Sequence, residues 1–167
     1  MLTSKTILFL AIAGASGAVT AAEAEDSPPD AAVFVEKAAQ DGMTEVELGK
    51  IALDKSKNAD VRDFAQLMVA DHGKANRELA SLASANGIDV PKKLDAEHQA
   101  LVNDMKSLDG ARFDATYSHH MSMDHTKAIS LFEAESKAPD KALADFAQKT
   151  LPTLQEHKQL ARKLPKD

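Results

Sequence analysis

The chain has 167 residues, with 20 Lys and Arg against 26 Asp and Glu, and it contains no Cys. The acidic balance argues against a nucleic-acid-binding protein, which would present a basic face. The absence of Cys excludes disulfide scaffolds, thiolate zinc sites, iron–sulfur clusters and cysteine nucleophiles. The length suits one domain, and the many Ala, Leu, Lys and Glu residues favour helices over sheet.

The first residues have the pattern of a secretory signal peptide. Lys5 precedes an apolar run over residues 7–19, and the small residues Ala22 and Ala24 suit a cleavage site. The run is too short to span a membrane comfortably, so we expect no stable membrane insertion after cleavage. An exported chain without Cys fits the bacterial periplasm. The expected parts are a signal peptide, a linker and one domain, over residues 1–22, 23–29 and 30–167.

Capping residues and turns divide this domain into helices. Asp30, Asn58 and Asp140 are suited to accept hydrogen bonds from the free amides of a first helical turn, and Gly87 suits the position after a helix end. We expect helices over about residues 30–57, 58–86, 95–105, 111–137 and from 140 onward.

Two features are expected to disturb these helices. The Asp-Gly pair at residues 41–42 should interrupt the first helix, and Thr44 with Glu47 would supply a capping box for a restart. Pro152 removes one backbone hydrogen bond from the last helix, so a kink or a restart near Leu151 is expected.

The helix pattern predicts the fold class. Each long helix carries apolar residues at spacings of three and four, as a buried face requires, and strand-like alternation is absent. Four long helices with a long middle crossover that contains a short helix predict an all-α, ferritin-like four-helix bundle.

Histidines are the residues most suited to carry chemistry. His72 and His157 fall on the apolar stripes of their helices, and His125 flanks the stripe of its own helix. Each follows an acid, which should serve another helix or solvent because adjacent helical residues point about 100° apart. Glu45 and Glu47 lie mid-way along the first helix, level with His72 and His125.

His157 is expected to lie away from that level. It falls about five residues past the middle of its helix, which corresponds to roughly 7 Å at about 1.5 Å per residue. That position would bring it nearer in height to His119 and His120.

Imidazoles and a carboxylate that converge inside an apolar bundle form a ligand set for a transition-metal ion. Zinc or copper is expected, and iron less so. His120 is a further candidate, because nearby Met residues would suit copper. The sequence contains no Glu-x-x-His, which disfavours a di-iron site and therefore a ferroxidase or oxidase. The predicted ligands of the ion are His72, His125 and His157 with Glu45 or Glu47.

A second hypothesis needs no metal. Buried polar groups lower stability unless each finds a partner, and acids and histidines could form a structural network in an envelope or stress-related module that acts through other proteins. The candidate site residues favour a metal-binding protein over an enzyme. The expected partner is the metal ion, no nucleic acid is expected, and a protein partner or a homodimer stays open.

Several separated motifs resemble those of one known family. They include MTEVELG at residues 43–49, MVADH at 68–72, MSMDH at 121–125 and TLPTLQEH at 150–157. In this order, over roughly residues 31–164, they resemble the exported bacterial family called domain of unknown function 4142, often labelled an outer-membrane protein. The resemblance implies a periplasmic ferritin-like four-helix bundle with defining positions at Glu45, His72, His125 and His157. The doubled His119-His120 also resembles that of a class of small periplasmic copper-binding bundles.

Overall fold

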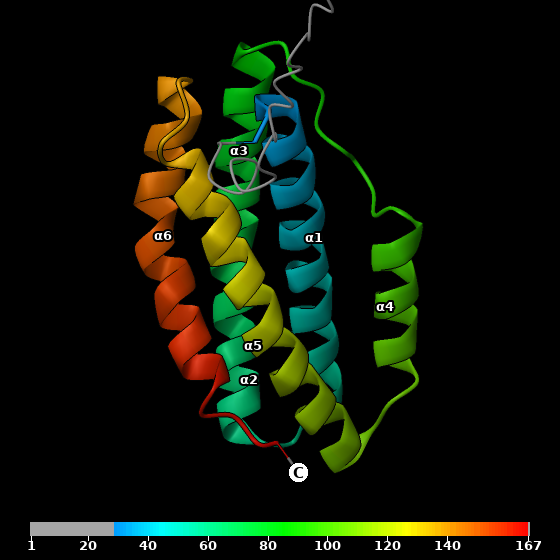
Figure 1. The fold of residues 1–167 in the computed structure, drawn as a ribbon. Coiled ribbons are helices and arrows are strands. Elements are labelled where there is room, and N and C mark those ends of the chain that lie inside the picture. Colours follow the sequence, from blue (N-terminus) through cyan, green and yellow to red (C-terminus); the bar gives the residue numbers. More distant parts are fainter. Residues whose placement is uncertain (1–28, 167) are drawn as a thin grey trace, which may run out of the picture.

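The computed structural model describes residues 29–166, and the chain there is helical (Figure 1). The predicted signal peptide over residues 1–22 and nearly all of the predicted linker lie outside the described residues. The elements are α1 (Ala31–Lys55), α2 (Ala59–Leu67), the π-helical turn η1 (Met68–His72), α3 (Gly73–Ala85), α4 (Ala96–Lys106), α5 (Gly110–Glu135) and α6 (Lys141–Ala161).

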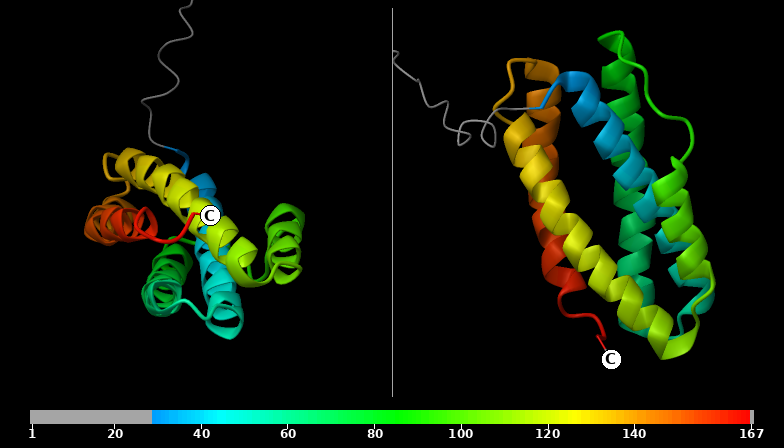
Figure 2. Two further views of the ribbon diagram at one scale, coloured as in Figure 1. Left: turned by 90° about the horizontal axis from the view of Figure 1, so that it is seen from below. Right: turned by 45° about the vertical axis from the view of Figure 1, so that its right-hand side comes forward.

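Four rods form the bundle. They are α1, the continuous rod made of α2, η1 and α3, and the helices α5 and α6, while α4 lies outside them along α1 (Figure 2). The chain crosses from α3 to α5 through α4, so the prediction of an all-α, ferritin-like four-helix bundle with a long middle crossover is confirmed. No described helix has both the length and the apolar character needed to cross a membrane.

The predicted helix caps form. The side chains of Asp30, Asn58 and Asp140 each accept a hydrogen bond from a backbone amide in the turn that follows. Gly87 has a φ of 68°, in the left-handed region that glycine adopts without strain. These local signals explain why the helix limits follow the sequence closely.

Helix α1 runs through the Asp-Gly pair at residues 41–42 without a break, so the predicted interruption is wrong. The Thr44 hydroxyl donates to the carbonyl oxygen of Gln40, 2.8 Å away in the same helix, and caps no new start. Helix α6 likewise runs without a break through Pro152, and no restart occurs at Leu151.

Glycines on α1 let a neighbouring rod come close. A Cβ added at Gly42 would collide with the side chain of Asn76 on α3. A Cβ added at Gly49, two turns further along, would lie 3.1 Å from the carbonyl oxygen of Ala65 on α2. Gly42 therefore serves helix packing, which outweighs its low helix propensity.

The second rod contains a π-helical turn that the sequence did not reveal. It spans Met68–His72, within the helix predicted for residues 58–86. A π turn inserts one extra residue into a helix and so changes the direction of the side chains that follow, and such turns are frequent at functional sites. The turn carries Asp71 and His72.

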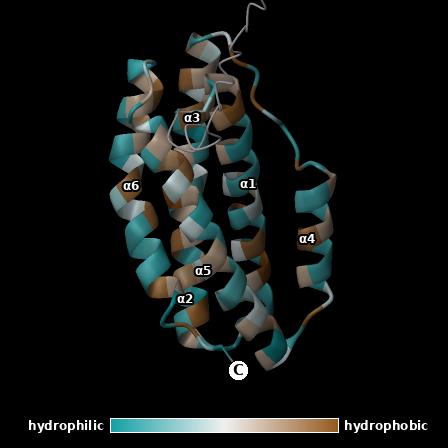
Figure 3. Cartoon of the chain, viewed as in Figure 1, coloured by the Kyte–Doolittle hydropathy of each residue, from teal (hydrophilic) through white to brown (hydrophobic). Residues whose placement is uncertain are grey.

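The apolar core is divided into two clusters by a polar layer. Hydrophobic residues (brown) and hydrophilic residues (teal) are mixed along the helices (Figure 3). Toward the α2 end lie Leu48, Phe64, Met68, Tyr117, Met121 and Ala161. Toward the α3 end lie Ala39, Leu79, Ala128, Phe132, Phe146 and Leu154. Between them each rod contributes a buried ionisable residue: Glu45, His72, His125 and His157.

Helix α4 is held against α1 by polar contacts at its start. The Asp95 backbone amide donates to Gln40 Oε1 at 3.1 Å. The ring of His98 lies between two acids, with Nδ1 2.8 Å from Asp95 Oδ1 and Nε2 3.3 Å from Asp41 Oδ1. A protonated His98 can donate to both carboxylates at once and so connects α4 to α1.

Replacing Gly49 by Val should destabilise the bundle, because a Cβ there already lies 3.0 Å from the Val69 side chain and 3.1 Å from the Ala65 carbonyl oxygen. We expect a loss of about 1–3 kcal/mol in urea unfolding. Gly73→Ala is the control, since the atom nearest its added Cβ is the end of the Arg77 side chain at 3.7 Å. This control should be neutral or stabilising by up to about 1 kcal/mol, and equal losses in both variants would contradict close packing at Gly49.

The contribution of His98 to stability should decrease as the pH rises. Partial burial alone would lower the pKa of His98, but hydrogen bonds to Asp95 and Asp41 raise it above the usual 6.5. The part of the stabilisation that comes from Asp95 is therefore complete below pH 6.5 and is lost as the pH rises through the raised pKa of His98. The part that comes from Asp41 weakens below about pH 6, because burial raises the pKa of Asp41 to about 6.

Thermal unfolding of His98→Ala tests this dependence. The variant should lose more stability at about pH 5.5 than at about pH 8.5, with a difference of at most about 1 kcal/mol for a partly exposed pair. Gln99→Ala, an exposed non-titrating neighbour on α4, should lose the same amount at both pH values. A loss in His98→Ala that does not vary with pH would exclude the charged pairing.

Candidate metal centre

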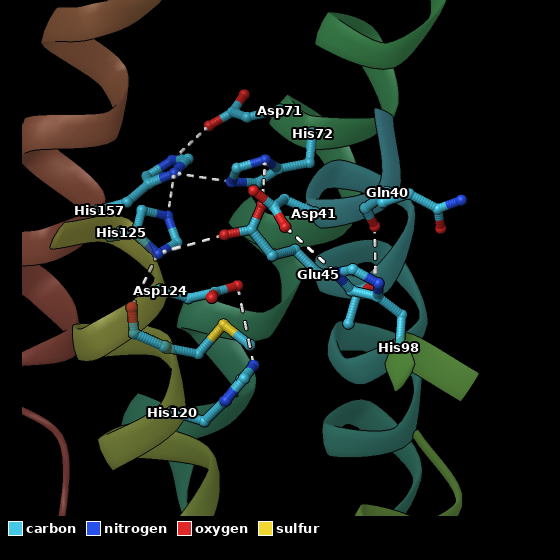
Figure 4. Close-up of polar contacts among 12 residues, drawn as sticks. Gln40, Asp41, Glu45, Asp71, His72, His98, His120, Asp124, His125 and His157 are labelled. Atoms are coloured by element: carbon cyan, nitrogen blue, oxygen red, sulfur yellow. Dashed lines mark hydrogen bonds and ion pairs between the residues drawn. The ribbon is translucent and has the colours of Figure 1, made fainter. Parts of the chain in front are cut away.

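Three histidines from three rods meet between the two apolar clusters (Figure 4). His72 comes from η1, His125 from α5 and His157 from α6, and all three are buried. His157 Nδ1 lies 3.3 Å from His72 Nε2 and 3.3 Å from His125 Nε2. Each ring can offer one nitrogen to a metal ion, and these nitrogens lie within 4.8 Å of one another. The structure thus brings together the three histidines that the sequence singled out.

The expected difference in height between His157 and the other two rings is wrong, given the 3.3 Å separations. The link after α5 passes beyond the end of that helix before α6 begins (Figure 1). The start of α6 is displaced along the bundle as a result, and His157 reaches the level of His72 and His125. Counting residues from helix midpoints does not capture this stagger.

Hydrogen-bond acceptors face the outer nitrogens of two of the rings. The carbonyl oxygen of Met121 lies 2.9 Å from His125 Nδ1, one turn earlier in the same helix. Asp71 Oδ2 lies 3.0 Å from His157 Nε2, across the space between η1 and α6. The expectation that an acid beside a histidine serves another helix is confirmed for Asp71.

The carboxyl group of Glu45 lies next to the outer nitrogen of the third ring. Its Oε2 lies 2.7 Å from His72 Nδ1, and its Oε1 lies 3.3 Å from His125 Nδ1. Both contacts are made to outer nitrogens, so Glu45 lies behind the rings and not among the nitrogens that face one another. A carboxylate or carbonyl on the far nitrogen is the usual partner of a metal-bound imidazole, because it fixes the ring's orientation and tautomer.

These acceptors determine where the ring protons lie. A carbonyl oxygen can only accept, so His125 Nδ1 carries the proton and His125 Nε2 presents a lone pair. The Asp71 carboxylate accepts from His157 Nε2, which leaves a lone pair on His157 Nδ1. These two lone pairs face each other across 3.3 Å. Buried acceptors without a donor lower stability, and a cation between them removes that penalty.

Protonation of the rings is opposed by their surroundings. Burial lowers the pKa of His72 to about 4. Burial is also the largest cause that lowers the pKa of His125 and of His157, and the neighbouring histidines lower both further. The rings are therefore neutral at neutral pH, and their inner nitrogens are available to a metal ion.

Two of the three separations between the inner nitrogens match a metal site. Two nitrogens bound at about 2.0–2.1 Å from a tetrahedral ion lie about 3.3–3.4 Å apart. The two measured separations from His157 Nδ1 are both 3.3 Å. Ligands from three rods would also be held by the packing of the whole bundle.

Burial is the largest influence on the pKa of the Glu45 carboxyl group. It raises the pKa of Glu45 to about 8, with a further increase from Asp124 that a nearby His125 opposes. Coulombic attraction to a bound cation would favour the ionised form of this carboxyl group.

Glu47 and His120, the other predicted ligands, are not brought to the three histidines. The Glu47 side chain is 42% exposed and pairs with Lys50 Nζ at 2.6 Å. His120 Nε2 lies 3.7 Å from Asp124 Oδ2, beside a separate surface cavity next to α4. Sequence reasoning assigned no specific acceptor to His125 or His157, and the only signal for Asp71 was its position next to His72.

Comparison with known proteins identifies the family. The chain belongs to the family described as domain of unknown function (DUF4142), which matches residues 16–164. The crystal structure of a DUF305 fragment from Deinococcus radiodurans is similar to the DUF4142 chain, with a TM-score of 0.70 and 16% sequence identity over 81% of this chain and 95% of that one. At this identity the similarity supports the fold alone. The curated proteins contain no match to the sequence.

Replacing Glu45 by Ala should destabilise the protein by about 1–3 kcal/mol, because the buried His72 Nδ1 would lose the carboxyl group that lies 2.7 Å away. Glu47→Ala is the matched control two residues away, and removal of its exposed carboxylate should change stability by less than about 0.5 kcal/mol. Urea unfolding measures both variants. A Glu45→Ala protein as stable as the wild type would show that this carboxylate does not support the histidine.

Proposed function

We propose that this DUF4142 protein is exported to the bacterial periplasm, where it binds one transition-metal ion through His72 Nε2, His125 Nε2 and His157 Nδ1. The observation that carries the proposal is the 3.3 Å separation of His125 Nε2 and His157 Nδ1 in the buried polar layer, with an acceptor next to the outer nitrogen of each ring, which leaves a lone pair on each inner nitrogen. A metal ion there replaces repulsion with coordination. Export is supported by the signal-peptide pattern over residues 1–22.

Zinc is the ion that suits this ligand set best. Imidazole nitrogens suit zinc, copper and iron, but copper(II) favours a tetragonal arrangement, whereas zinc accepts tetrahedral spacing without preference. Iron in carboxylate-bridged bundles needs carboxylate ligands. Glu45, the buried acid nearest the three rings, makes its contacts to outer nitrogens. Copper is therefore the principal competitor of zinc.

Binding should be measured on protein made without an affinity tag and stripped of metal with a chelator. Calorimetric titration with zinc should give one ion per chain. His157→Ala should bind zinc at least about 100-fold more weakly. His119→Ala is the control, since its side chain is exposed and lies outside the three-histidine group, and it should bind zinc as the wild type does.

Zinc should also stabilise the folded chain. At a free concentration 100 times its dissociation constant, zinc should add about 2.7 kcal/mol to the free energy of unfolding. A chelator should remove this gain. Negligible zinc and copper uptake by the wild type, with no thermal shift, would exclude the proposal.

The competing hypothesis is a metal-free module stabilised by an acid–histidine network. A Glu45 carboxyl group that keeps its proton would donate to His72 Nδ1, and His72 Nε2–H would then donate to His157 Nδ1. The 2.7 Å and 3.3 Å separations fit these two hydrogen bonds. In that case His157→Ala should lose stability equally with and without a chelator, and zinc should have no effect on the wild type.

A further inference from the structure

The three-histidine group leaves a metal ion short of one ligand. The group contains His72, His125 and His157, and a zinc ion is bound by four ligands. Glu45 makes its contacts to the outer nitrogens of two rings. A fourth ligand would have to reach the three inner nitrogens from the α2 side or from the α3 side.

Toward α2 the site is closed by an aromatic ring. The Phe64 ring centroid lies 6.4 Å from that of His125 and 6.3 Å from that of His157, with interplanar angles of 61° and 79°. Phe64 is itself buried in the apolar cluster at that end of the bundle. Phe64 therefore covers the α2 side of His125 and His157.

Toward α3 there is space next to His72, which is the one member of the three-histidine group that borders it. A cavity of about 20 Å³ is bordered by Glu45, His72, Thr150 and Leu154, among others. This volume is sufficient for one water molecule, and Glu45 and Thr150 give its wall polar character. It lies on the side of the histidines that Phe64 does not cover.

This cavity adjoins a groove that opens to the surface. The groove has a volume of about 110 Å³, lies between α3 and α6, and is bordered by His72 and His157 at its inner end. Ala75, Thr150 and Leu154 border both the cavity and the groove. The cavity and the groove therefore share part of their walls.

The outer end of the groove is polar. Lys149 Nζ on α6 lies 2.6 Å and 2.9 Å from the two carboxylate oxygens of Glu78 on α3, so this ion pair spans the groove. Asp71, which faces His157, has a side chain that is 41% exposed here. Small hydrophilic ligands thus meet charged groups at the surface and the histidines at the inner end.

We propose that the metal ion keeps an exchangeable fourth position on the α3 side, filled by water or by a small monodentate anion that enters through the groove between α3 and α6. The inference rests on the proposed function, because the position exists only when an ion is bound. Three protein ligands with one exchangeable ligand are typical of reactive zinc sites, whereas structural zinc sites are closed by four protein ligands.

Cobalt(II) in place of zinc tests the fourth position, because its visible absorption reports changes in coordination. Wild-type protein is stripped of metal, loaded with cobalt(II), separated from free metal by gel filtration and titrated with azide. We expect one cobalt per chain and a saturable change in the visible bands, with the cobalt content unchanged at the end of the titration.

The access route is tested with Ala75→Leu, which enlarges a side chain that borders both the cavity and the groove. Its cobalt content should equal that of the wild type, while its azide affinity should fall at least about tenfold. Ala85→Leu is the matched control, because Ala85 is exposed at the end of α3, and its azide affinity should be that of the wild type.

Each other outcome contradicts a defined part of the inference. Cobalt binding without any spectral response to azide would exclude the exchangeable position but would not contradict the proposed metal site. An unchanged azide affinity in a folded Ala75→Leu protein would exclude the groove as the route. Absence of cobalt binding together with absence of zinc binding would exclude the proposed function itself. If Ala75→Leu does not fold, the wild-type titration still decides whether the position exchanges.

Discussion

The site depends on two imidazole lone pairs that are held facing each other in the buried polar layer. One is fixed locally, because His125 Nδ1 lies next to the carbonyl oxygen of the residue four places earlier in α5. The other is fixed by tertiary structure, because Asp71 reaches His157 from a different rod. Neither ring can turn its proton inward without losing its acceptor, so the two lone pairs must face a cation or, at His157 Nδ1, a proton on His72 Nε2.

The rest of the bundle keeps these groups in place. An apolar cluster on each side of the polar layer excludes water, which strengthens electrostatic interactions inside the layer. Gly42 and Gly49 allow α1 to approach the second rod closely, and Glu45 lies between them on α1. A single carboxylate from α1 can then contact both His72 and His125.

Much of the fold and part of the site could be predicted from the sequence. Helix limits follow from caps such as Asn58 and from apolar spacing, since both are local. The trio of histidines follows because buried helix faces point to a common interior. The height of His157 in the bundle was predicted wrongly, because the displacement of α6 along the bundle depends on the geometry of the link between α5 and α6. Residue counts do not contain this geometry.

Other features could not be predicted from the sequence, for related reasons. The π turn at Met68–His72 has no compositional signature in this chain, although it carries two residues of the site. The pair at residues 41–42 has the composition of a turn, but tertiary packing overrides that preference. The part played by Glu45 depends on which ring nitrogens it faces, and that requires coordinates.

The distribution of the three histidines along the chain affects when an ion can be captured. His72 and His157 are 85 residues apart, and His125 and His157 are 32 apart. No two of them could chelate an ion within one helical turn, so the unfolded polypeptide has little affinity to compete with the native state. Under the proposed function, capture of an ion would therefore follow folding, and the bound ion would close two long loops and disfavour separation of the rods.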